Sequence, residues 1–228
     1  MLDKSFLDLK LNSFPSPAGL LGGQEAAQRI FSAIRNSERI AVFTDADSDG
    51  VHSAAILFWF FRLIDYPVSI TVSNKLRDGY GLTELYAETV SADLVITADT
   101  GITAIGPASI LRSRGIDLIV TDHHLPSPAG LPAAFAVVDP HQDGCSYAHK
   151  DICGAQVVWL VLSLVNTLLD KPVAMQSFLP FVTVATIGDM VNIANFNHPL
   201  IRVGLKAFSS SLFPAFGAIP EEHLRNEE

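Results

Sequence analysis

Short apolar runs alternate with helix-like segments along the first two thirds of the chain, and this rhythm is the strongest constraint on its fold. Five runs have the length and composition of buried strands: residues 39–44, 68–73, 94–98, 117–121 and 134–138. Longer segments with helical spacing separate the first four: residues 51–63, 82–90 and 103–114. Strand–helix–strand units of this kind join parallel strands. The sequence therefore predicts an α/β fold, a doubly wound and mostly parallel sheet with helices on both faces.

The remainder of the chain predicts a helical segment after the sheet. Residues 155–169, 175–187 and 200–208 carry helical patterns, and the last twenty residues are rich in Ser, Pro and Glu. We expect an N-terminal extension with a first helix (1–38), one main domain (39–208) and a loose C-terminal tail (209–228).

Composition excludes several classes of protein. The 15 Lys and Arg against 24 Asp and Glu give a net charge of −9, which argues against a protein that coats nucleic acid by charge alone. Two cysteines are too few for a disulfide framework. The first residues lack the apolar core of a signal peptide, and no apolar stretch reaches the ~20 residues that span a bilayer. We expect a cytoplasmic protein without a membrane partner.

Acidic residues and histidines follow the apolar strands at the point where each strand ends. Asp45, Asp47 and Asp49 follow the first strand, Asp99 follows the third, and an Asp-His-His run follows the fourth. The carboxyl ends of parallel strands share one edge of the sheet, where open α/β sheets bind ligands. Topology alone should therefore bring these side chains together.

The residue types at this edge suit divalent cations. Asp45-Ala-Asp-Ser-Asp-Gly50 is not an EF-hand, because its twelfth position is Ile56 and a strand precedes it. His123 and His124 add nitrogen ligands, and Asp189 lies in an apolar run where an unpaired carboxylate is costly. A mixed oxygen and nitrogen set favours two Mn²⁺ ions, with Mg²⁺ as the alternative.

Each motif also has a structural explanation when taken alone. Asp49 or Asp99 would cap the helix that follows it, the histidine pair would be a surface loop, and Asp189 would bond to backbone at a helix end. A second cluster carries zinc-ligand types at four-residue intervals: His141, Cys145, His149 and Cys153. Its spacing is not that of a zinc ribbon, and two buried thiols with two loop histidines is the simpler interpretation.

The motifs DADSDG, ADTG, TDHHLP and GDMV, in that order, resemble the four motifs of the DHH phosphoesterases. Further segments are similar to the RecJ branch of single-strand-specific exonucleases: KLRDGYGL (75–82), VVDPHQDGCSY (137–147), ICGAQVVW (152–159) and NHPLIRVGL (197–205). The resemblance covers residues 39–205 and implies that 39–208 form a DHH catalytic domain. It also implies metal ligands, at Asp45, Asp47, Asp99, His123 and Asp189.

Further roles follow from the same resemblance. Catalytic roles are implied for His124, Asp99 and Asp49, and substrate contacts for His124, Arg77 and Tyr80. Many family members carry a histidine where this chain has Ala41, so one metal site is a ligand short. No motif of a DHH-associated domain or OB-fold follows residue 205, so we expect these domains to be absent. The chain is then a minimal catalytic core, a shortened form of a longer protein, or a subunit for which a protein partner supplies the missing substrate-binding domain.

The resemblance implies an exonuclease of DNA repair and recombination that releases 5′-mononucleotides from the 5′ end of single-stranded DNA by two-metal catalysis. One alternative is a hydrolase of short oligonucleotides, cyclic dinucleotides or pyrophosphate, which the sparse basic residues favour. Another is a catalytically silent scaffold in a replication or repair complex. Such scaffolds tend to lose metal ligands, whereas the core positions are present here.

Overall fold

The fold is built on a five-stranded sheet in which every neighbouring pair runs parallel, in the order β2-β1-β3-β4-β5. The computed structural model describes residues 13–74, 79, 81–208 and 213–217. The strands are β1 (Ile40–Thr44), β2 (Val68–Val72), β3 (Leu94–Ala98), β4 (Asp117–Thr121) and β5 (Ala136–Val138). Each lies within its predicted range, and the predicted fold class is confirmed.

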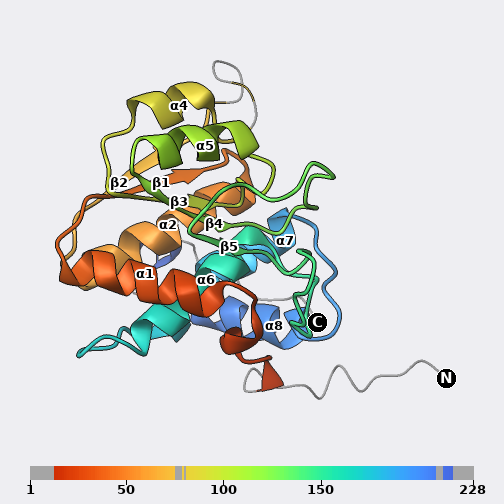
Figure 1. Cartoon of the computed structure of the whole chain (residues 1–228). Helices are drawn as coiled ribbons and strands as arrows, with labels where there is room; N and C mark the ends of the chain where they lie inside the picture. Colours follow the sequence, from red (N-terminus) through yellow and green to blue (C-terminus); the bar gives the residue numbers. More distant parts are fainter. Residues whose placement is uncertain (1–12, 75–78, 80, 209–212, 218–228) are drawn as a thin grey trace.

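Helices cover both faces of this sheet (Figure 1). On one face lie α4 (Glu84–Thr89) and α5 (Ile105–Ser113); on the other lie α1 (Gly23–Arg35), α2 (Ser48–Leu63) and α6 (Gly154–Asn166). The described helices also include α7 (Leu179–Gly188), α8 (Asn197–Ala207), α9 (Pro214–Gly217) and the 3-10 turns η3 (Pro17–Gly19) and η4 (Met175–Phe178). Among the described residues, every helix is too short or too polar to cross a membrane.

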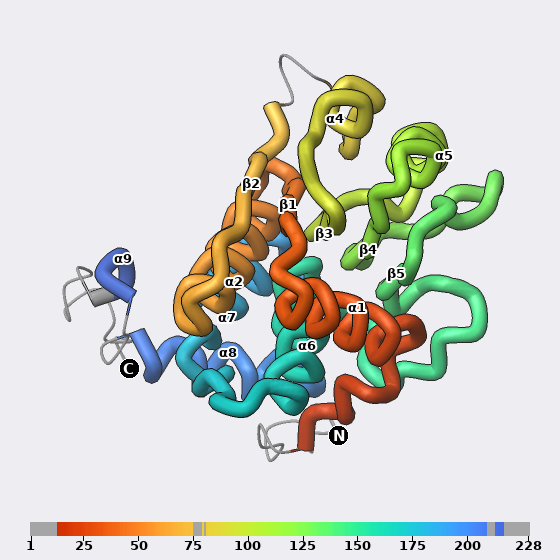
Figure 2. Tube along the Cα trace, turned by 60° about the vertical axis from the view of Figure 1, so that its left-hand side comes forward, coloured from red at the N-terminus to blue at the C-terminus, as the bar shows by residue number. Residues whose placement is uncertain are grey.

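Two hydrophobic cores form because successive side chains of a strand point to opposite faces. Ile40 and Val42 of β1 pack with α1, α2 and α6 in the larger core, whereas Ala41 and Phe43 pack with the α4 and α5 side. Figure 2 shows the strands side by side between these two layers. The larger core contains α6 and α7, so the helical segment after the sheet belongs to the same domain.

Two stretches differ from the sequence expectation. The predicted helix 175–187 divides into η4 and α7, because Pro180 lacks the amide hydrogen that a continuous helix needs and fits only in the first turn of α7. Within the expected loose tail, Phe213 and Phe216 are buried and their rings contact Phe181. Burial of these two rings explains why this part of the tail packs on the domain.

Candidate metal centre

The carboxyl ends of β1, β3 and β4 lie in register at one edge of the sheet. Thr44 pairs with Ala98, and Ala98 pairs with Thr121, so the residues that follow them begin at the same level. The order of the strands reverses between β1 and β3, which is the position where open α/β sheets bind ligands. The sheet therefore brings the strand-end motifs together as the sequence predicted.

His123 lies at the centre of this edge, among three carboxylates. Its Nε2 atom is 3.2 Å from Asp99 Oδ1, 3.6 Å from Asp49 Oδ2 and 3.6 Å from Asp189 Oδ2. Two overlapping groups of potential metal ligands result: Asp99, His123 and His124, and Asp49, His123 and Asp189. The explanation of the histidine pair as a surface loop is wrong for His123, whose side chain is only 11 % exposed.

Two atoms of the site, Asp99 Oδ1 and His123 Nε2, are buried and have no hydrogen-bond partner among the residues that the structure describes. Leaving such groups unsatisfied costs ~1–3 kcal/mol each. Mn²⁺ binds both carboxylate oxygens and imidazole nitrogens, whereas Mg²⁺ prefers the carboxylate oxygens. The residues present therefore fit a divalent cation.

Asp99 is the most perturbed residue of the centre. It is buried, and its backbone takes the left-handed conformation with φ 58°. Burial, together with the neighbouring carboxylates of Asp49 and Asp47, raises the pKa of Asp99 to about 11. The first residue of α5 is Ile105 and its N-cap is Ala104, so the explanation of Asp99 as a helix cap is wrong. A carboxyl group held beside other carboxylates is typical of a cation site.

Asp45 and Asp47 occupy the rim of the centre. Asp45 Oδ1 accepts a hydrogen bond from Ser73 Oγ (2.9 Å), and Asp45 lines a cavity of about 270 Å³ together with Asp99 and His124. The side chain of Asp47 caps α2 by accepting the amide of Gly50 (3.1 Å). Asp45 thus opens onto the same cavity as Asp99, and Asp47 lies close enough to perturb the Asp99 pKa.

Asp49 binds a different helix from the one that contains it. Its two carboxylate oxygens accept the amides of Gly154 (2.5 Å) and Ala155 (2.8 Å), at the start of α6. The capping role expected for Asp49 on α2 is therefore wrong, and Asp47 takes it. The start of α6 also packs closely against Asp99. A Cβ atom at position 154 would lie 2.7 Å from Asp99 Cβ, so only glycine fits there. Asp49 thus joins the start of α6 to the metal centre.

Asp122 and His124 form a hydrogen-bonded pair beside the cavity. Asp122 Oδ1 lies 2.7 Å from His124 Nδ1, and Asp122 Oδ2 accepts the amide of Ile102 (2.9 Å). Burial is the largest single effect and opposes the charged form of Asp122. The hydrogen bond and charge of His124 and the backbone amides of Ile102 and His123 together outweigh it, and the pKa of Asp122 is lowered. The same hydrogen bond raises the pKa of His124 to about 9. His124 is therefore cationic at neutral pH, and its half-exposed ring suits an anionic ligand.

Asp189 lies at the C-terminal end of α7, within reach of His123. Its pKa is raised, chiefly by burial. Arg77 and Tyr80, the predicted substrate contacts, lie outside the described residues. The four zinc-ligand types at 141–153 form no metal-binding group among the residues that the structure describes: Cys145 and Cys153 are buried free thiols, and His149 pairs with Asn197.

Sequence reasoning missed Asp139, which directly follows β5. It is fully buried, and burial is the main reason that the pKa of Asp139 rises to about 7. The signal was available, because Asp139 follows an apolar strand in the same way as Asp45, Asp99 and Asp122 follow theirs.

Comparison with known proteins agrees with this arrangement. Residues 39–186 match the sequence model of the DHH family, N-terminal domain. The single-stranded-DNA-specific exonuclease RecJ of Bacillus subtilis is 33% identical over 205 residues, which are 88% of this chain and 25% of that protein. The crystal structure of exonuclease RecJ bound to manganese superposes with a TM-score of 0.77 at 30% identity, over 84% of this chain and 49% of that one.

A structure of RecJ in complex with Mn²⁺ from Thermus thermophilus gives a TM-score of 0.76 at 28% identity, over 89% of this chain and 29% of that one. The chain thus spans a quarter to about a half of the proteins to which these similarities extend.

Proposed function

The chain belongs to the DHH family, and from this premise we propose that it is a metal-dependent phosphodiester hydrolase that releases 5′-mononucleotides from the 5′ end of single-stranded DNA. The observation that carries the proposal is the unpartnered pair of Asp99 Oδ1 and His123 Nε2, 3.2 Å apart between Asp49 and Asp189. The similarity to RecJ exonucleases, two of them crystallised with manganese, supports the substrate and the metal.

Five side chains would hold two divalent ions, with Mn²⁺ preferred: Asp45, Asp47, Asp99, His123 and Asp189. When bound, such ions supply a water of lowered pKa and neutralise charge on the phosphate oxygens. His123 belongs to both groups of potential ligands, and Asp99 Oδ1 lies 3.2 Å from its Nε2 atom, so these two residues lie at the centre of the site that would hold the ions.

The remaining residues of the centre bind and orient. His124, held by Asp122 and cationic at neutral pH, stabilises negative charge on the scissile phosphate. Asp49 positions the start of α6 beneath Asp99. Arg77 and Tyr80 remain predicted contacts of the substrate. Residues 39–208 form the proposed catalytic unit, and a protein partner that adds substrate-binding surface is part of the proposal.

The test is a Mn²⁺-dependent assay on 5′-labelled single-stranded DNA. Double-stranded DNA, a dinucleotide, a cyclic dinucleotide and pyrophosphate are assayed in parallel, and Asp99→Asn serves as the inactive control. We expect mononucleotides from the single strand, no product from the duplex, and loss of turnover in the variant.

Two results contradict the proposal. Cleavage of only the small substrates would assign the site to the hydrolysis of short nucleotides or pyrophosphate, for which the cavity of about 270 Å³ has room. Bound Mn²⁺ without turnover of any substrate would indicate a scaffold.

A further inference from the structure

The ends of β4 and β5 carry the same Asp-x-His arrangement. In Asp122-His-His124, Asp122 Oδ1 accepts the amide of His124 (3.2 Å) and faces its ring Nδ1 at 2.7 Å. In Asp139-Pro-His141, Asp139 Oδ1 accepts the amide of His141 (2.6 Å) and faces its ring Nδ1 at 3.7 Å. Each aspartate thus fixes the backbone of the histidine two residues later and lies against its ring.

The two pairs begin at the same level of the sheet. Thr121 pairs with Val138, and the amide of Asp122 donates to the carbonyl oxygen of Val138 (3.1 Å). Asp122 and Asp139 therefore leave neighbouring strands side by side. Neighbouring strands lie about 4.8 Å apart, and a nucleic acid strand carries one phosphate per about 3.4 Å when stacked and over a longer distance when extended. His124 and His141 each follow by three residues a paired position on neighbouring strands, so they leave the sheet at a separation of the same order as that between consecutive phosphates.

The Asp139–His141 pair contains polar atoms that make no hydrogen bond in the described part of the chain. Asp139 is fully buried, and among the described residues its Oδ2 atom and the buried Nδ1 atom of His141 have no hydrogen-bond partner. The side chain of His141 is nevertheless 30 % exposed, so the ring has a face open to a ligand. A buried carboxylate beside an imidazole can hold the orientation of the ring.

The surroundings of Asp139 carry charges of both signs. After burial, the hydrogen bond from the His141 amide and the charges of His124 and Lys150 lower the Asp139 pKa, whereas the charge of Asp122 raises it. Lys150 is exposed. His124, His141 and Lys150 thus all lie near enough to interact with one buried carboxyl group, and His124 also lines the cavity with Asp45 and Asp99.

We propose that His141 is a substrate-binding residue that contacts the phosphate adjacent to the scissile one, and that Asp139 positions it. The proposal rests on the phosphodiesterase function proposed above. The ligand is a nucleic acid strand with at least two phosphates, of which His124 faces the first and His141 the second. The resemblance that identified the metal ligands assigned no role to either residue of this pair.

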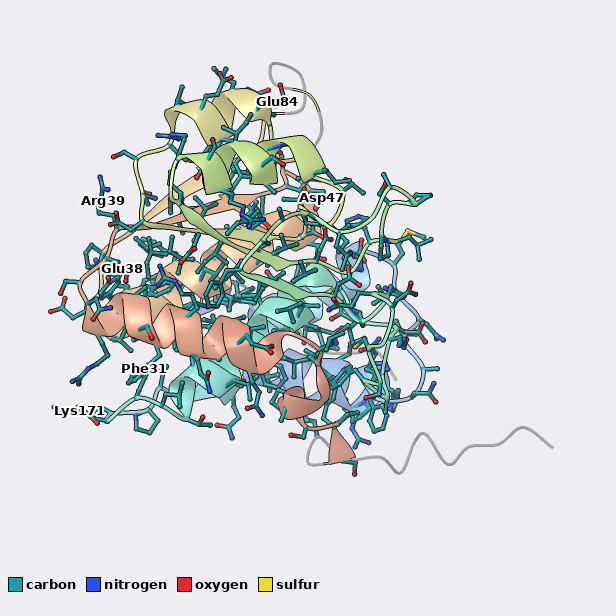
Figure 3. The ribbon with its side chains drawn as sticks, in the orientation of Figure 1. Phe31, Glu38, Arg39, Asp47, Glu84 and Lys171 are labelled. Atoms are coloured by element: carbon teal, nitrogen blue, oxygen red, sulfur yellow. The ribbon has the colours of Figure 1, made fainter. Side chains whose placement is uncertain are left out.

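The test is a double-mutant cycle between His141 and that phosphate. The substrate is a 5′-phosphorylated thymidine trinucleotide, compared with one that carries a neutral methylphosphonate at the second linkage and one that lacks the 5′-phosphate. The proteins are the 228-residue chain, His141→Gln and Asp139→Asn. Lys171→Gln is the control, because Lys171 is exposed and lies far from Asp47 (Figure 3).

Two quantities are measured: kcat/KM with Mn²⁺, and Kd with Ca²⁺ as a probe that need not support turnover. With the fully charged substrate, we expect His141→Gln to lose 10- to 100-fold in both, as for a hydrogen bond to a charged group. If the phosphate that His141 contacts is the one removed or neutralised, the loss caused by His141→Gln should fall below about twofold. This should happen with one of the two altered substrates and not with the other. Asp139→Asn keeps an acceptor for the His141 amide, so its loss should be smaller and should depend on the same phosphate. Lys171→Gln should behave as the unaltered chain.

Equal losses on all three substrates, or no binding of the trinucleotide, would overturn the role of His141. A cycle that is non-additive in Kd while no substrate is turned over would retain that role and refute the proposed function. Thermal unfolding of each variant shows whether it is folded. If Asp139→Asn does not fold, His141→Gln decides the matter alone, since its partly exposed ring makes no ring hydrogen bond in the described residues.

Discussion

The two edges of the sheet differ in how their carboxylates are neutralised. At the amino edge, carboxylates pair with arginines: Arg29 Nε lies 2.7 Å from Asp117 Oδ2, and Arg39 Nη2 lies 2.8 Å from Asp93 Oδ1. At the carboxyl edge, the described ion pairs of Asp49, Asp99 and Asp189 all share one histidine, His123. Figure 3 shows Arg39 and Glu38 at one end of the sheet and Asp47 at the other.

Cavity size and charge favour different edges as the functional one. A cavity of about 650 Å³ lies at the amino edge, lined by Glu38, Arg39 and Tyr66 among others, whereas the cavity beside Asp99 measures about 270 Å³. Carboxylates paired with arginines are already neutralised, whereas clustered carboxylates are stabilised by a proton or a bound cation. The proposed function therefore rests on unbalanced charge rather than on cavity size.

The largest expected contrast is in catalysis. Asp99→Asn should lower kcat by about 10³-fold or more, because the proposed function makes Asp99 a metal ligand. Asp93→Asn, at the amino edge, should leave kcat within about twofold. Steady-state kinetics with Mn²⁺ on single-stranded DNA compares the two, and equal losses would show that the edges do not differ in function.

Metal binding should stabilise the protein through residues of the carboxyl edge and not of the amino edge. At about 100 times its Kd, Mn²⁺ should add ~2.7 kcal/mol to the free energy of unfolding and raise Tm by about 5–10 °C. Chelation should reverse the increase, Asp99→Asn should diminish it, and Asp93→Asn should keep it. Differential scanning calorimetry measures the shift; an undiminished shift in Asp99→Asn would place the ion elsewhere.

In the metal-free protein, lowering the pH should change the contributions of Asp99 and Asp93 to folding stability in opposite directions. Unfolded, Asp99 loses its proton near its ordinary pKa of 3.8, whereas folded it keeps the proton up to about 11. The folded state therefore binds more protons between these values, and its stability should rise as pH falls, by at most ~1.4 kcal/mol per pH unit. Asp93 has a folded pKa of about 2, because Arg39 holds it charged, so its contribution is lost as pH falls from 3.8 towards 2.

Urea unfolding in the presence of a chelator, between pH 8 and pH 5, tests the first half of this expectation. The stability gain should shrink in Asp99→Asn and persist in Asp93→Asn. An unchanged pH slope in Asp99→Asn would mean that another group supplies it.

The smallest effect is expected from the exposed ion pair. Arg39→Ala removes a contact to Asp93 on the surface, where such pairs contribute little. Tm should change by no more than about 2 °C and kcat should not change. A large loss of activity would show that the amino edge takes part in function.

Local sequence pattern was sufficient for the sheet and for most of the centre. The five short apolar runs assigned as strands are strands, and a parallel sheet places the residues after them on one edge, which predicted that Asp45, Asp99 and His123 lie together. The contact of Asp49 with α6 could not be predicted in this way. It joins residues 105 positions apart through helix packing that no local pattern encodes. The burial of Phe213 likewise depends on the faces of distant helices.

The hydrogen bonds between Asp49 and the α6 amides imply an order of assembly. All five strands, and the acidic and histidine motifs that follow them as far as His124, precede Gly154 in the chain. A nascent chain that ends at this point contains the carboxylates of the strand ends. It lacks the α6 amides that bind Asp49 and it lacks Asp189, so the candidate metal centre is incomplete. Since domains fold as units during synthesis, the capacity to bind metal should appear late and abruptly, when α6 and α7 dock. Metal affinity is thus a property of the finished tertiary structure, acquired together with it.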